Sequence, residues 1–159
     1  MHGPGAVPRR FVLRPAAIAV PTKIAHTLTL DGVDKVVAAA QRAAEASKVR
    51  VVIAVVDASG ALLVLRRLDD TQVASVRVAI DKARTAAIYR RPSKVFEDQT
   101  SSGRVGALAL NGAVPLQGGI PIMLGDEVIG AIGVSGETPK IDEDIAIAGA
   151  KAAKAFAER

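Results

Sequence analysis

The apolar positions of this chain follow two kinds of pattern, one typical of helices and the other of strands. In residues 30–47 apolar residues recur every three or four positions, which predicts an amphipathic helix capped by Thr29. Residues 49–56 form an almost unbroken β-branched run that predicts a strand buried on both faces. The turn-forming residues 57–60 connect it to a second predicted strand at residues 61–68, which gives an antiparallel hairpin.

The second half of the chain continues this alternation of patterns. A helix is predicted after Thr71, because apolar residues return at helical spacing, and it ends before Pro92. Residues 94–99 predict a short helix, and residues 107–110 predict a short strand. The last helix begins at Pro139, with acidic residues in its first turn and basic residues near its end, the order that the helix dipole favours.

A glycine-rich hairpin is predicted between these elements, at residues 117–122 and 128–136. Glycine inside a strand marks a bulge, a bend, or the close approach of another backbone or a ligand. Gly118 and Gly119 have two interpretations. Either they open a hollow whose N–H groups bind a small ligand, with Ser135 adding a hydroxyl, or they allow a helix to pack closely on the sheet or one subunit on another. The chain has neither a P-loop motif nor a dinucleotide-binding motif that joins a strand to a helix.

The order of the predicted elements indicates the fold class. The strands come in antiparallel groups and do not alternate one by one with helices. This order is typical of the α+β class and predicts a five-stranded antiparallel sheet packed with helices. At 159 residues the chain is long enough for one domain with a substantial core. We assign this domain to residues 27–159 and treat residues 1–26 as a basic, proline-containing N-terminal extension.

The net charge of +5 is concentrated in the extension. Residues 1–26 contain four basic residues and no acidic residue, so the domain is almost neutral and we expect no nucleic-acid partner. Arg9 and Arg10 resemble a twin-arginine export signal, but the apolar segment at residues 16–20 is too short for one, which favours a cytoplasmic protein. No apolar run approaches the roughly 20 residues that span a bilayer, so no membrane partner is expected. The absence of cysteine excludes disulfides and thiolate catalysis.

Five motifs occur in the order in which a known family has them. They lie at residues 65–70, 81–87, 118–122, 128–136 and 142–146. Through these motifs the chain resembles the GlcG/HbpS family, also called DUF336 or the haem-degrading domain family, which includes the C-terminal domain of PduO-type proteins. The resemblance extends over the whole predicted domain.

The resemblance implies a profilin-like, GlcG-type fold and assembly into homo-oligomers, from dimers to octamers. Members of the family include haem-binding proteins and domains attached to cobalamin metabolism, so the resemblance implies haem or a corrinoid as a cofactor. We expect a small-ligand-binding protein that holds haem, a corrinoid or a small organic acid in a pocket near an oligomer interface. The alternative is an enzyme that acts on a small hydroxy- or oxo-compound, in which only Lys82 or Asp57 could transfer a proton.

Three basic residues are candidates for binding an anionic ligand. Lys82 falls close to the apolar side of its predicted helix, so its ammonium group either meets an anionic ligand or extends past the core to solvent. Arg66 and Arg67 are neighbours on a strand and point to opposite faces. One of them is therefore a candidate anion clamp, and the other is a surface or interface charge.

A haem iron needs an axial donor, usually His, Cys, Met or Tyr. His26 lies just before the first predicted helix, where it either reaches a ligand pocket or a neighbouring subunit, or serves as a surface or capping residue. Met123 is interpreted as a core residue at the end of an apolar strand. The other donors in the chain are Met1, His2 and Tyr89. The acidic residues 142–144 are predicted to stabilise a helix start and not to bind a metal.

Overall fold

The computed structural model describes residues 20–157. The predictions about Met1, His2, Arg9 and Arg10 therefore lie outside the described residues. The helices are α1 (Leu30–Ala46), α2 (Ser75–Tyr89), α3 (Lys94–Ser101), the 3₁₀ helix η1 (Val105–Ala109) and α4 (Pro139–Ala157). The strands are β1 (Val52–Asp57), β2 (Leu62–Arg67), β3 (Gly119–Leu124) and β4 (Glu127–Ser135). The predicted helices are confirmed to within a few residues, except that α2 begins at Ser75 and not directly after Thr71.

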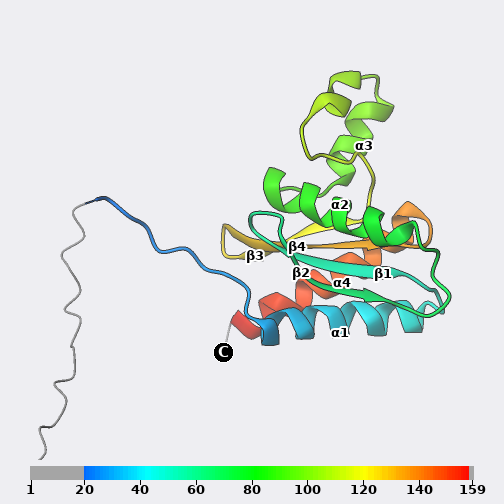
Figure 1. Cartoon of the computed structure of the whole chain (residues 1–159), viewed down its shortest axis with the longest axis horizontal. Helices are drawn as coiled ribbons and strands as arrows, with labels where there is room; N and C mark the ends of the chain where they lie inside the picture. Colours follow the sequence, from blue (N-terminus) through cyan, green and yellow to red (C-terminus); the bar gives the residue numbers. More distant parts are fainter. Residues whose placement is uncertain (1–19, 158–159) are drawn as a thin grey trace, which may run out of the picture.

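The sheet has the strand order β2-β1-β4-β3, and every pair of neighbours is antiparallel. Helices α1 and α4 pack together on one face, and α2 crosses the other face (Figure 1). Helix α3 and η1 form a lobe that stands on the α2 side and projects away from the sheet (Figure 1). The α+β class is therefore confirmed.

The prediction of five strands was wrong, because the described residues form a sheet of four. The segment expected as a strand at residues 107–110 instead belongs to η1 and the turn after it. Its backbone bonds are local, from Ala107 N–H to the Arg104 carbonyl and from Leu110 N–H to the Ala107 carbonyl. The segment alternates Ala with Leu, as a strand can, but only Ala107 of η1 is buried, so its side chains do not cover a face of the sheet.

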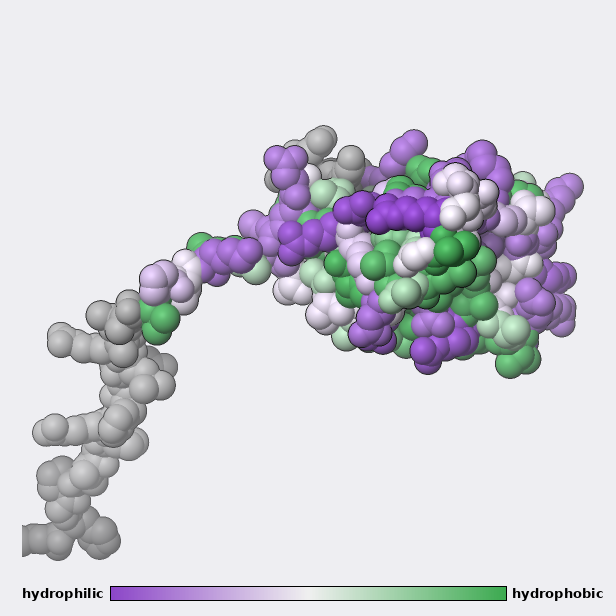
Figure 2. Space-filling view, turned by 90° about the horizontal axis from the view of Figure 1, so that it is seen from above, coloured by the Kyte–Doolittle hydropathy of each residue, from purple (hydrophilic) through white to green (hydrophobic). Residues whose placement is uncertain are grey.

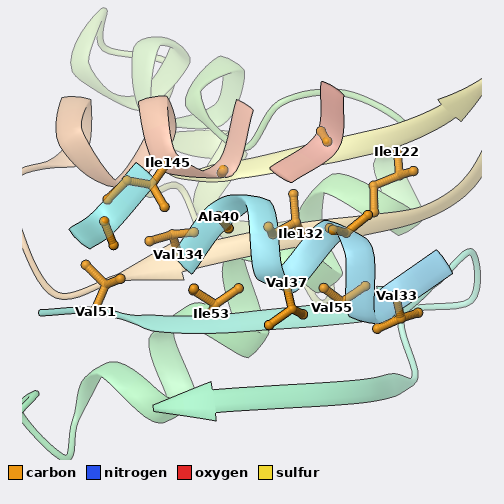
Figure 3. Close-up of a cluster of buried hydrophobic side chains, with 14 of the residues drawn as sticks. Val33, Val37, Ala40, Val51, Ile53, Val55, Ile122, Ile132, Val134 and Ile145 are labelled. Atoms are coloured by element: carbon orange, nitrogen blue, oxygen red, sulfur yellow. The ribbon is translucent and has the colours of Figure 1, made fainter. Parts of the chain in front are cut away.

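The main core lies between the sheet and the α1–α4 layer, and it is built from aliphatic side chains. Ile53 and Val55 alternate along β1 and point toward Val33 and Val37 of α1 (Figure 3). The strand β1 is buried along almost its whole length, as the β-branched run predicted. Ile122, Ile132, Val134 and Ile145 complete this cluster (Figure 3).

The opposite face of the sheet lacks large side chains where α2 crosses it. A Cβ atom added at Gly133 would lie 2.1 Å from the carbonyl oxygen of Ala79, and one added at Gly119 would lie 2.1 Å from that of Lys82. Alanines of α2, among them Ala83, face these glycines. The helix backbone therefore packs directly on the strand backbone, which is the close-packing alternative for the glycine-rich hairpin.

This contact predicts a large difference between two glycine-to-alanine substitutions. Gly133→Ala should destabilise the protein by about 2 kcal/mol or more, because the new methyl group forces α2 away from β4. Gly106→Ala is the matched control, since nothing lies within 4 Å of a Cβ atom there, and it should change stability by less than about 0.5 kcal/mol. Urea unfolding measures both values, and equal stability of the two variants would contradict the close contact.

Candidate functional site

Lys82 of α2 and Asp142 of α4 form a buried ion pair beside the last residues of β4. The Lys82 ammonium group donates to Asp142 Oδ2 at 2.8 Å and to the Val134 carbonyl at 2.9 Å. Asp142 Oδ1 accepts a hydrogen bond from the Glu137 N–H at 3.0 Å. The two side chains are only 5% and 2% exposed. Because α2 and α4 lie on opposite faces of the sheet, this pair connects the two helical layers.

Gly118 provides the space that the ion pair needs. A Cβ atom at this position would lie 3.0 Å from the Lys82 ammonium nitrogen and 2.9 Å from the Val134 carbonyl oxygen. The backbone of Gly118 also has φ +123°, a conformation that residues with a side chain rarely adopt. Glycine is thus required here both for its conformation and for the room it leaves to Lys82.

Burial and pairing act in opposite directions on Asp142. Removal from water raises the pKa of the Asp142 carboxyl, and the hydrogen bond and charge of Lys82 lower it, with burial the stronger effect. The anion that Lys82 meets in this structure is therefore a carboxylate of the protein itself. Asp142 does lie in the first turn of α4, as predicted, but its contacts are those of a buried pair.

Gln117 extends this polar region toward the α3 lobe. Its side-chain amide donates to Glu143 Oε2 at 2.6 Å, and its backbone N–H donates to Glu97 Oε2. One glutamine thereby holds a carboxylate of α4 and a carboxylate of α3.

Lys94 of α3 lies in the field of the same two carboxylates. The hydrogen bond to Asp98 raises the pKa of Lys94, and the charges of Glu143 and Glu97 raise it further. Among the described residues, no group of three or more His, Asp or Glu is arranged to hold a metal ion.

The structure brings four of the predicted ligand residues to one end of the sheet. Lys82, Gly118 and Gly119 touch one another there, and Ser135 follows directly after the carbonyl that Lys82 binds. Ser135 is buried, and it is opposite Val52 in the sheet.

The two predicted arginines lie on β2 and point to opposite faces, as the strand pattern indicated. Arg66 donates to Gln41 Oε1 at 2.8 Å on the α1 side. Arg67 donates through Nε to the Thr71 carbonyl at 3.0 Å. They stand two strands away from β4, because β1 lies between β2 and β4, so they are separated from Lys82.

His26 lies at the opposite end of β4 from Lys82, beside a surface hollow. The hollow has a volume of about 500 Å³. Its other lining residues are Lys23, Ile24, Ala25, Ala58, Arg90, Asp126, Glu127 and Val128. Four segments therefore line the hollow: the chain before α1, the β1–β2 turn, the end of α2 and the β3–β4 turn.

Glu127 holds His26 by two hydrogen bonds. Its Oε2 lies 2.7 Å from His26 Nδ1, and its Oε1 accepts the His26 backbone N–H at 3.2 Å. These hydrogen bonds, the side-chain one first, lower the pKa of Glu127. A carboxylate that accepts from Nδ1–H of a neutral imidazole leaves Nε2 with its lone pair, the arrangement found behind metal-ligating histidines. Sequence reasoning missed this pair, because 101 positions separate its members.

The other described axial-donor candidates are engaged elsewhere. The Tyr89 hydroxyl donates to the Asn111 carbonyl at 2.7 Å, and the ring packs edge-on against Phe96 with centroids 5.0 Å apart. Met123 is half-buried on β3 and lines a small apolar hollow of about 190 Å³ with residues of α4. Of these donors, His26 is the one oriented by a carboxylate beside a large hollow.

Asp57 has the turn role that the sequence predicted. Its Oδ1 accepts from the Ser59 N–H at 2.8 Å, from the Ser59 hydroxyl at 2.6 Å and from the Ala61 N–H at 3.0 Å. The Ser59 hydroxyl is the largest cause of the lowered pKa of Asp57. The carboxylate is used in closing the β1–β2 turn, which is not the geometry of a general base poised over a substrate.

Comparison with known proteins identifies the family. The family model described as Haem degrading protein HbpS-like matches residues 28–151. The chain belongs to this family. Protein GlcG of Escherichia coli strain K12 is 38% identical to it over 100 residues, which are 63% of this chain and 75% of GlcG. The family resemblance inferred from the five motifs is thereby confirmed.

Solved structures support the same assignment. The crystal structure of Klebsiella pneumoniae protein ORFY, a DUF336 protein, matches with a TM-score of 0.80 and 27% identity, covering 87% of this chain and 99% of ORFY. The crystal structure of the PduOC:heme complex matches with a TM-score of 0.73 and 27% identity, covering 80% of this chain and 95% of that chain. Within the described residues, no helix of this HbpS-like protein is long and apolar enough to cross a membrane.

The buried pair generates a stability prediction. Asp142→Leu should cost about 3–5 kcal/mol, because it leaves the Lys82 ammonium group buried without its counter-charge. The double variant Lys82→Met with Asp142→Leu removes both charges and should regain most of this loss. Urea unfolding compares the two variants. The exposed pair of Arg77 and Asp81 is the control, and Arg77→Ala should cost less than about 1 kcal/mol.

The single variant Lys82→Met completes the comparison. A double variant that loses as much stability as Lys82→Met and Asp142→Leu lose together would contradict this account of Lys82 and Asp142. Additive losses would mean that the two groups do not interact.

Asp57 generates a prediction on pH dependence. Its pKa in the folded protein lies below the ordinary 3.8, so its ionised form stabilises the fold above that pH. Asp57→Asn should therefore lower the free energy of unfolding by a constant amount between pH 5 and pH 8. The difference should shrink as the pH falls through the pKa of the folded protein. Urea unfolding at pH 3 and pH 7 measures it, and an unchanged difference at the two pH values would refute the role of the charge.

Proposed function

We propose that this protein binds haem in the hollow beside His26, and that His26 Nε2 would hold the iron. The observation that carries the proposal is the pairing of His26 Nδ1 with Glu127 at 2.7 Å. This pairing fixes the ring and directs the proton to Nδ1, so Nε2 is the nitrogen that remains for a metal. The imidazole is 58% exposed, so it is accessible to a ligand in the hollow.

The lining of the hollow suits the two chemical parts of haem. Ile24 is 89% exposed and Val128 lies beside it in the lining, so apolar surface is available for the macrocycle. Lys23 and Arg90 lie in the same lining and supply positive charge for the propionates. A volume of about 500 Å³ is in the range of small-molecule and cofactor pockets. When bound, the haem would supply an iron centre, and the protein would supply the donor and its orientation.

Membership in the HbpS-like family and the likeness to the PduOC:heme complex support haem as the ligand. Binding of a corrinoid or a small organic acid stays a prediction, as do assembly into dimers or octamers and a cytoplasmic location. Contacts of a ligand with the residues at the far end of the sheet and on β2 also stay predictions; these residues are Arg66, Arg67, Lys82, Gly118, Gly119 and Ser135.

A haemin titration tests the proposal. Haemin added to the purified protein should give a saturable shift of the Soret band. His26→Ala should weaken binding at least tenfold and abolish the shift, and added imidazole should restore part of it by supplying the missing donor. Glu127→Gln should weaken binding about tenfold, since loss of an orienting carboxylate typically costs 10–100-fold in metal affinity.

Tyr89→Phe and Met123→Leu are the control variants, because each removes another candidate donor and leaves the hollow intact. Both should bind haemin as the unmodified protein does. Full binding of haemin by His26→Ala would overturn the assignment of His26, and loss of binding in either control would assign the donor to that residue instead.

A further inference from the structure

Exposed apolar side chains gather on η1, on the segment that follows it and at the end of α2. Figure 2 shows hydrophobic residues together on the face seen from the α3 side, with strongly hydrophilic residues along their margin. We call this surface the η1 patch, and each member is 36–68% exposed. Its apolar members are Ile88, Val105, Leu108, Leu110 and Leu116.

The η1 patch is held in place by hydrogen bonds to α2. The Val114 N–H donates to Thr85 Oγ1 at 2.8 Å, and the Tyr89 hydroxyl donates to the Asn111 carbonyl at 2.7 Å. A Cβ atom added at Gly112, where φ is +72°, would lie 3.1 Å from Ile88 Cδ1 and 3.9 Å from Arg84 Nε. The segment after η1 thus packs on α2, and these contacts fix the positions of its leucines.

Two arginines without a carboxylate partner lie next to these apolar residues: Arg84 near Ile88, and Arg104 directly before Val105. Among the described residues, Arg84 and Arg104 make no ion pair, and Arg91 donates only to the Tyr89 carbonyl. Of the nearby carboxylates, Asp81 pairs with Arg77 at 2.9 Å and Asp98 pairs with Lys94, while Glu97 of α3 accepts the Gln117 backbone N–H. The η1 patch therefore has an apolar centre with Arg84 and Arg104 at its margin, where neither makes an ion pair with a described residue.

We propose that the η1 patch binds an acidic segment of a partner protein, which inserts apolar side chains among the leucines and places carboxylates on the arginines. Arginine forms bidentate hydrogen bonds with carboxylates, and apolar anchors inside a polar rim are typical of protein interfaces. A second copy of this chain docked through the same patch would set one arginine-bearing margin against the other. Like charges facing each other disfavour that arrangement.

Nucleic acid fits the η1 patch less well than an acidic protein segment does. Single-stranded nucleic acid needs exposed aromatic faces on which bases stack. The nearby rings of Tyr89 and Phe96 pack on each other, and Phe96 is only 3% exposed. The centre of the patch is aliphatic, which favours the side chains of a protein.

Selection of peptides on the intact protein tests the proposal. A phage-displayed library of random 12-residue peptides is panned against the protein, and the enriched peptides should combine Asp or Glu with large apolar residues. Fluorescence anisotropy with the best peptide then measures affinity. Leu108→Ser and the double variant Arg84→Gln with Arg104→Gln should each weaken binding at least tenfold. Both should keep the Soret shift with haemin, so a failure here is distinguishable from a failure of the haem proposal.

Leu63→Ser on β2 and Arg42→Gln on α1 are the matched controls, since both residues are exposed and lie outside the patch. They should bind the peptide as the unmodified protein does. Enriched peptides without an excess of acidic residues, or unchanged binding in the patch variants, would overturn the proposal. A dimer in light scattering that Leu108→Ser dissociates would also overturn it. Binding to phosphatidylserine vesicles that the patch variants weaken as much as they weaken peptide binding would overturn it too.

Discussion

The buried ion pair between Lys82 and Asp142 constrains much of the architecture around it. A charge that is removed from water must be paired, so the middle of α2 and the first turn of α4 have to meet beside the last residues of β4. That meeting leaves no room for a side chain at Gly118, and it keeps the α2 backbone against the strand at Gly119. One pair of charges thus accounts for the position of two helices and for two glycines in the hairpin.

The two ends of β4 consequently differ in character. At the Ser135 end, the polar groups of the ion pair face one another inside the protein, and Gln117 adds two more carboxylates to the network. At the Glu127 end, polar groups surround an open hollow, and His26 has one ring nitrogen held and the other available. The first arrangement is suited to holding layers together, and the second is suited to receiving a ligand.

Local patterns and turn chemistry were enough to predict most of the elements. The period of the apolar residues indicated α1, the β-branched run indicated β1, and the turn that begins at Asp57 followed from the turn-forming residues 57–60. The family was recognised because five motifs occur in order. The extra strand was predicted wrongly, because a segment that alternates Ala with Leu can also form a 3₁₀ turn when no sheet edge takes it up.

The contacts that define both ends of β4 could not be read from the sequence. Lys82 and Asp142 are 60 positions apart, and His26 and Glu127 are 101 positions apart. Periodicity placed Lys82 near the apolar side of its helix, but whether it meets a ligand or an internal carboxylate depends on how α2 and α4 pack. Only a three-dimensional arrangement brings such partners together.

The backbone contact between α2 and the sheet also determines where this fold can change. A pocket on that face would require side chains to be shortened, but most of the positions in closest contact are already glycine or alanine, so substitution has little left to remove. New cavities can therefore arise only at the margins, in the turns at the Glu127 end and in the α3–η1 lobe. The scaffold can diversify its ligands by exchanging loops while the helix-on-sheet contact stays invariant.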